Sequence, residues 1–85
     1  MNWMTQRERL LSKIRNNPYD VTFADLTAVL EGLGFPLVRT RGSHHFFRVG
    51  KRTVIVPRHG AKVKAYVVQQ ALYALDEFYG TDSSS

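Results

Sequence analysis

The residues of this chain that could do chemistry are concentrated between Arg39 and Lys64. All three histidines of the sequence lie there, at positions 44, 45 and 59. Eight of the twelve Lys and Arg residues lie there too: Arg39, Arg41, Arg48, Lys51, Arg52, Arg58, Lys62 and Lys64. No Asp or Glu occurs between Glu31 and Asp76. A stretch this basic, with histidines beside glycines, is typical of a surface that meets phosphate.

Histidine surrounded by arginine and lysine is suited to cutting RNA. An imidazole can take the proton of a 2′-hydroxyl or give a proton to the leaving 5′-oxygen. Arg and Lys can bind the phosphate and offset the charge that develops on it. RNA supplies its own nucleophile, so the reaction needs no metal and no nucleophilic side chain. Histidines at strand ends also serve as ordinary hydrogen-bonded residues, so composition alone leaves both roles open.

Other chemistries fit this sequence poorly. The basic stretch has no carboxylate for glycosidase or metal–carboxylate chemistry, and the chain has no nucleotide-binding glycine motif. The histidine spacing does not match a zinc site, and there is no cysteine to complete one. Ser43 and His44 are adjacent, so on an extended chain they point to opposite faces and cannot form a nucleophile pair. We therefore predict no metal and no cofactor.

Size and composition limit the architecture. A chain of 85 residues predicts one domain, residues 1–85, and a hydrophobic fraction of 44% is ordinary for a globular protein. The net charge of +5 alone does not decide between a nucleic-acid partner and a basic protein of another kind. No apolar run is long enough to span a bilayer, and no signal peptide is recognisable, so we predict a cytoplasmic protein that does not enter a membrane.

Two helices are predicted in the first third of the chain. Residues 1–17 are expected to form an N-terminal helical extension, because Thr5 and Glu8 have the spacing of a capping box and Pro18 follows its end. A second helix is expected from Thr22, with Gly34 as its C-terminal cap. Its apolar residues recur at helical spacing and form a core face: Phe23, Leu26, Val29, Leu30 and Leu33.

After Pro36 the pattern changes to the alternation of strands. We predict strands at residues 37–41, 45–49 and 53–56, joined by turns at Gly42-Ser43 and Gly50-Lys51. Such short connections require an antiparallel meander. Residues 58–63 are expected to form a loop, residues 64–78 a last helix, and residues 80–85 a flexible tail.

The predicted fold is therefore α+β: a two-layer domain in which helices back a three-stranded antiparallel sheet. Without the extra N-terminal helix, the order is α-β-β-β-α, as in a double-stranded-RNA-binding domain. That similarity concerns the fold and does not establish a function.

Alternation within the strands separates core residues from exposed ones. Phe47 and Val49 make the better core pair, so His44, Phe46 and Arg48 are expected to face outward. In the preceding strand we place Leu37, Arg39 and Arg41 on the face opposite Val38 and Thr40. An outward Phe46 beside arginine suits base stacking, and it equally suits contact with a protein partner.

The remaining residues of the basic stretch have other expected roles. His45 is expected to be partly buried and to support the sheet. His59 lies in a loop and is a candidate for a second proton-transfer group or a phosphate ligand. Gly42 and Ser43 are expected to shape the backbone of the turn. The predicted RNA contacts are Arg39, Arg41, Phe46, Arg48 and Lys62.

The run from Gly34 to Leu72 resembles the HicA/YcfA toxin family of mRNA interferases. The resemblance begins with Gly34-Phe35 and is most specific at Gly42-Ser43-His44 followed by an aromatic pair, Phe46-Phe47. It continues through residues 53–57, then His59-Gly60 and Lys62, and into the following helix. Members of that family have a fold similar to a double-stranded-RNA-binding domain. The helix of residues 1–17 is an extension beyond the minimal members.

This resemblance implies a type II toxin that cleaves mRNA as a metal-independent endoribonuclease and is neutralised by a HicB-like antitoxin. His44 falls on the family's catalytic histidine. The alternative is a non-catalytic RNA-binding module of the same fold, which would also tolerate His44.

Overall fold

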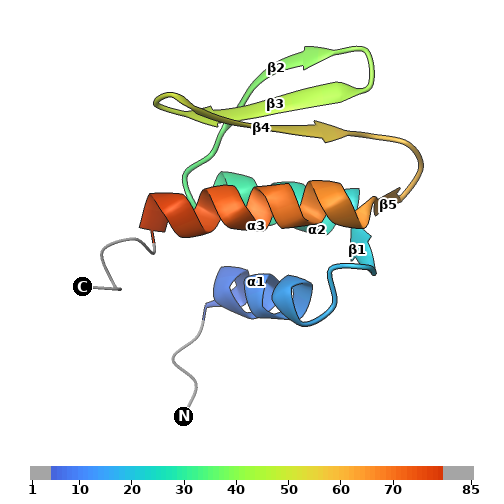
Figure 1. Cartoon of the computed structure of the whole chain (residues 1–85), viewed down its shortest axis with the longest axis vertical. Helices are drawn as coiled ribbons and strands as arrows, with labels where there is room; N and C mark the ends of the chain where they lie inside the picture. Colours follow the sequence, from blue (N-terminus) through green and yellow to red (C-terminus); the bar gives the residue numbers. More distant parts are fainter. Residues whose placement is uncertain (1–4, 80–85) are drawn as a thin grey trace.

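The computed structural model describes residues 5–79, which form three helices, a three-stranded sheet and a small two-stranded sheet (Figure 1). The elements follow in the order α1 (Gln6–Asn16), β1 (Val21–Thr22), α2 (Phe23–Gly32), β2 (Leu37–Arg41), β3 (His44–Val49), β4 (Arg52–Pro57), β5 (Lys62–Val63) and α3 (Ala65–Tyr79). The large sheet lies against α2 and α3, and α1 lies on the other side of these two helices. The predicted α+β fold is confirmed, while the tail predicted for residues 80–85 lies outside the described residues.

The three-stranded sheet is the meander that the sequence predicts. Its strand order is β2-β3-β4, and both neighbouring pairs are antiparallel. The first turn lies at Gly42-Ser43, where Gly42 has a φ of 59°, a left-handed conformation that glycine adopts without a side-chain clash. The strands extend slightly beyond the predicted bounds, so that His44, Arg52 and Pro57 belong to them.

One face of this sheet is buried against the helices. Phe47, Val54 and Val56 are at most 4% exposed, and they belong to one core cluster with Leu30 of α2 and Val68 of α3. Burying one such side chain fully contributes roughly 1.5–3 kcal/mol. The inner face of the sheet is therefore fixed by packing, and the opposite face is left to solvent or to a partner.

The N-terminal ends of α1 and α2 have the predicted caps. In α1, the Thr5 hydroxyl accepts a hydrogen bond from the Glu8 amide, and the Glu8 carboxylate accepts one from the Thr5 amide. In α2, the Thr22 hydroxyl accepts a hydrogen bond from the Asp25 amide at 3.1 Å. Two residues before these helices thus satisfy amides that would otherwise lack partners.

A glycine turn connects α2 to the sheet. Gly34 has a φ of 101°, and its amide donates to the carbonyl of Glu31, while the Phe35 amide donates to that of Leu30 at 2.8 Å. This is a Schellman-type helix end, and it confirms the predicted capping role of Gly34. The turn places Phe35, which is fully buried, in the core immediately before β2.

The prediction of a loop over residues 58–63 is wrong at its end. Lys62 and Val63 form β5, which pairs antiparallel with β1, with Val21 opposite Val63 and Thr22 opposite Lys62. Two-residue strands are too short to show an alternating pattern in the sequence. Their pairing follows from tertiary packing, because Val21 and Val63 are both buried.

Within residues 5–79, no helix is long and apolar enough to cross a membrane.

Candidate functional site

The outer face of the large sheet carries two cross-strand rows. Arg41 of β2 and Pro57 of β4 lie on either side of His44, and Arg39 and Ile55 lie on either side of Phe46. Residues directly opposite each other in an antiparallel ladder point to the same face. His44 and Arg48 are exposed and Phe47 is buried, in agreement with the alternation predicted for β3. The histidine is thus flanked on this face by a guanidinium group and a proline ring.

The prediction for Leu37 is wrong. Leu37 pairs with Phe47 on the inner face, whereas Arg39 pairs with Phe46 on the outer face, because the register shifts between residues 37 and 39. A bulge inserts one extra residue and reverses the alternation on one side of it. Arg39 and Arg41 keep their predicted place beside His44, but Leu37 does not share their face.

Phe46 forms an aromatic platform edged by a cation. The guanidinium carbon of Arg39 lies 5.8 Å from the centre of the Phe46 ring, within the range of a cation–π contact. Ile55, on the other side of Phe46, is 43% exposed. Arg48 lies further along β3, where its Nε donates to the carbonyl of Gly50 at 2.8 Å. A flat, partly apolar surface with arginines at its edges can stack a base and bind the adjoining phosphate.

His45 faces the other way and holds the turn that precedes His44. Its Nδ1 lies 3.0 Å from the Ser43 carbonyl oxygen, which can only accept, so Nδ1 carries the proton. The Arg58 amide donates to the same oxygen at 2.8 Å. The His45 ring packs edge-on against Phe23 with 4.8 Å between centroids, and the Arg58 guanidinium lies 4.9 Å from that Phe23 ring. We call His45, Phe23 and Arg58 the turn clamp.

The two remaining candidates, His59 and Lys62, lie together beyond the end of β4. Both line a hollow of about 160 Å³, together with Pro57, Lys64, Tyr66 and Val67. Lys62 forms an ion pair with Asp20, so its charge is partly compensated. The structure thus groups Arg39, Arg41, Phe46 and His44 on the sheet, with Arg48 at the far end of β3 and His59 and Lys62 beside the hollow.

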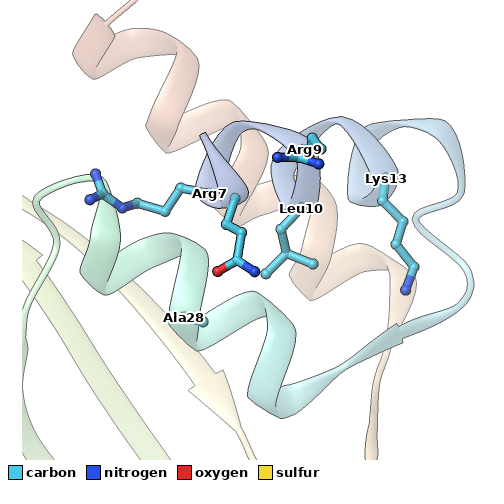
Figure 2. Close-up of a pocket in the computed structure, with 6 residues that line it drawn as sticks. Arg7, Arg9, Leu10, Lys13 and Ala28 are labelled. Atoms are coloured by element: carbon cyan, nitrogen blue, oxygen red, sulfur yellow. The ribbon is translucent and has the colours of Figure 1, made fainter. Parts of the chain in front are cut away.

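Two larger hollows lie along α1, on the side of the molecule remote from the sheet. One of about 520 Å³ lies between α1 and α2, where Leu10 and Ala28 line it together with three cations (Figure 2). Arg7 reaches toward the end of α2 and donates to the Gly32 carbonyl at 3.1 Å. No histidine lines this hollow between α1 and α2, so the volume of a hollow does not by itself mark the place where proton transfer is possible.

The arginines of the outer face have no acidic partner among the residues that the structure describes. The ion pairs among residues 5–78 join Lys13 to Asp25, Arg15 to Asp76, Arg52 to Glu77 and Lys62 to Asp20. None of them includes an arginine of the outer face. Positive charge on that face therefore has no paired acid and favours an anionic partner.

Two acids at these ion pairs have shifted pKa values. The hydrogen bond from Tyr73 lowers the pKa of Glu77, and the charge of Arg52 acts in the same direction. The hydrogen bond from Lys62 lowers the pKa of Asp20. Glu77 and Asp20 are thus paired with Arg52 and Lys62, and neither carboxylate is paired with an arginine of the outer face.

Several residues around this site were not predicted from the sequence. Ile55 and Pro57 are ordinary strand residues in the sequence, and only the β3–β4 register places them beside Phe46 and His44. Lys64 and Tyr66 follow β5 and enter the hollow because the chain turns there into α3. The density of Lys and Arg over residues 39–64 was a signal for Lys64, but no sequence pattern marks Tyr66.

The fold and this face define a small α+β protein with a basic, aromatic sheet surface. The family model described as HicA toxin of bacterial toxin–antitoxin matches residues 23–75, from the start of α2 into α3. Because the match covers more than half of the chain, the protein belongs to the HicA toxin family. It is the toxin of a toxin–antitoxin system, which implies a cognate antitoxin. Helix α1 precedes the matched region. The searches of curated proteins and of solved structures found no match.

The adjacent histidines should respond differently to truncation. His45→Ala removes the hydrogen bond to Ser43 and the contact with Phe23, which together contribute about 1–2 kcal/mol. We expect its thermal midpoint to fall by roughly 5–10 °C. His44→Ala removes an exposed side chain that has no hydrogen bond or ion pair within residues 5–78, so its midpoint should stay near that of wild type. Thermal unfolding followed by circular dichroism tests this, and equal midpoints for the two variants would contradict the turn clamp.

Proposed function

We propose that this HicA-family toxin is a metal-independent endoribonuclease that cleaves mRNA in the cytoplasm with His44 and is neutralised by a HicB-like antitoxin. The observation that carries the proposal is the row that sets exposed His44 beside Arg41 on a face without paired acids. Phe46 and Arg39 form the next row on this face, two residues further along β3. A proton-transfer group, a phosphate ligand and a stacking platform are therefore neighbours.

Each residue of the face has a proposed role. Arg41 binds the scissile phosphate, Phe46 stacks on a neighbouring base, and Arg39 and Arg48 bind the backbone on either side. Gly42 and Ser43 form the turn that aims His44, and the turn clamp fixes the position of the Ser43 carbonyl. His59 is the proposed second proton-transfer or phosphate group, and Lys62 adds positive charge beside it.

The proposed reaction needs only RNA and proton transfer. His44 takes the proton of a 2′-hydroxyl, the 2′-oxygen forms a bond to the adjacent phosphorus, and the bond from phosphorus to the 5′-oxygen breaks. The leaving 5′-oxygen takes a proton from His59 or from water. The products are a 2′,3′-cyclic phosphate and a free 5′-hydroxyl. A guanidinium beside the phosphate stabilises the extra negative charge of the transition state.

The second candidate is a non-catalytic RNA-binding module. Within residues 5–78, the His44 imidazole has no hydrogen bond that orients it, which favours this alternative. The same face also exposes Ile55, at 43%, which suits contact with the antitoxin. The antitoxin would then neutralise the toxin by covering the surface that binds RNA.

Expression in cells separates the two candidates. We expect wild type, induced without its antitoxin, to arrest growth and degrade mRNA, and we expect His44→Ala to do neither, because it lacks the proton-transfer group. Growth curves and RNA blots measure both effects. Persistent arrest by a well-folded His44→Ala protein would sink the catalytic role.

The cleavage products test the chemistry. We expect 2′,3′-cyclic phosphate and 5′-hydroxyl ends, no cleavage of DNA, and no loss of activity in EDTA, because the 2′-hydroxyl is the nucleophile. A loss of rate at low pH would identify His44 as the base, and a loss at high pH would identify it as the acid. The control is a substrate with one 2′-deoxy position at the cut site. Cleavage there, 5′-phosphate products, or activity restored by magnesium after EDTA would contradict the mechanism.

The arginines of the outer face should govern the salt dependence of RNA binding. Replacing Arg39, Arg41 and Arg48 together by Ala removes up to three phosphate contacts. For single strands each lost contact reduces the slope of log K against log salt by about 0.7. Fluorescence anisotropy measures this slope at several salt concentrations with RNA that is not cut during the titration. An unchanged slope would place RNA elsewhere, and parallel titration with the antitoxin reports whether it uses the same arginines.

A further inference from the structure

The hollow beyond the end of β4 has the composition of an anion site. We call it the Lys64 hollow; it is lined by Pro57, His59, Lys62, Lys64, Tyr66 and Val67. One imidazole, two ammonium groups and one phenol surround a space of about 160 Å³, and no carboxylate lines it. Its polar residues can each donate a hydrogen bond to an anion. Its other two residues form an apolar wall: Pro57 is partly buried, and Val67 is buried.

Lys64 is the cation that is free to bind a ligand here. Lys62 is already paired with Asp20, whereas the Lys64 side chain has no ion pair or hydrogen bond within residues 5–78. The backbone of Lys64 is nonetheless fixed, because its carbonyl accepts hydrogen bonds from Val67 at 3.0 Å and Val68 at 3.1 Å. A fixed backbone beside a buried valine limits where the ammonium group can lie.

The Lys64 hollow adjoins the proposed catalytic residue. Pro57 forms part of its wall and is also the residue directly opposite His44 in the β3–β4 ladder. Opposite residues in an antiparallel pair have Cα atoms about 4.5–5.5 Å apart. A nucleotide chain that passes over Arg41 and His44 therefore reaches Pro57 next, and the hollow lies directly beyond it.

We propose that the Lys64 hollow is a second phosphate subsite, which binds the RNA phosphate that neighbours the scissile one. The inference rests on the proposed ribonuclease function and adds Lys64 and Tyr66 to the RNA contacts. Lys64 supplies the charge, Tyr66 and His59 supply hydrogen bonds, and Asp20 holds Lys62 at the rim. A phosphate has acceptor oxygens on all sides, so it can use donors from several directions at once, whereas a carboxylate of a protein partner presents only two oxygens.

The test uses the full chain with two probes that are not cut, inorganic phosphate and a short single-stranded DNA. In nuclear magnetic resonance titrations, we expect the amide signals of residues 64–67 to shift with both probes. Lys64→Ala should weaken DNA binding up to about fivefold and reduce the salt slope by about 0.7. Tyr66→Phe removes only the hydroxyl and should give a smaller loss. Lys13→Ala is the matched control, since Lys13 lies on α1, across the helices from the sheet.

Three results would overturn the subsite. The first is equal salt slopes for Lys64→Ala and Lys13→Ala. The second is a set of shifts confined to β2, β3 and β4. The third is a Lys64→Ala variant that binds DNA normally but binds the antitoxin weakly, which would assign the hollow to a protein contact. Failure of wild type to cleave RNA would instead contradict the proposed function, because binding of the two uncut probes does not depend on catalysis.

Discussion

Burial of the inner face of the sheet is the constraint on which the rest of the structure depends. Phe47 and Val54 are opposite each other in the β3–β4 ladder, and both pack into the core with α2 and α3. Because side chains alternate along a strand, burying Phe47 forces His44, Phe46 and Arg48 to the other side. A register slip of one residue would place a histidine and an arginine in the core. The hydrophobic effect thus positions the polar site without contacting it.

The sequence predicted most of this arrangement for the same physical reason. Alternation across Phe47 and Val49 was sufficient to orient β3, and the Thr5–Glu8 spacing was sufficient to locate the start of α1. Capping and alternation are local properties, so they can be read from neighbouring residues. What failed was non-local: the bulge that places Leu37 opposite Phe47, and the pairing of β1 with β5, depend on how strands pair with one another.

The same difference between local and non-local features decides which parts of the candidate site could be predicted from the sequence. His44 and its arginines lie on one short strand pair, so their common face could be predicted from the sequence. The turn clamp could not, because Phe23 begins α2, His45 lies in β3 and Arg58 follows β4. The grouping of His59 with Lys64 and Tyr66 likewise depends on where the chain turns into α3. Residues that support or extend the site come from elements that only the fold brings together.

The packed core and the arginines that have no acidic partner lie on opposite faces of one small sheet. The ion pairs link α1 to α2 and α3, β4 to α3, and Lys62 of β5 to Asp20, while the arginines beside His44 have none. Like charges on one exposed face repel each other, and a bound polyanion relieves that repulsion. Any partner that binds only the folded protein also stabilises it by mass action, which matters in a domain whose core is small. In the proposed function, RNA and antitoxin would compete for this face, so the antitoxin would block the toxin and stabilise its fold through the same contacts.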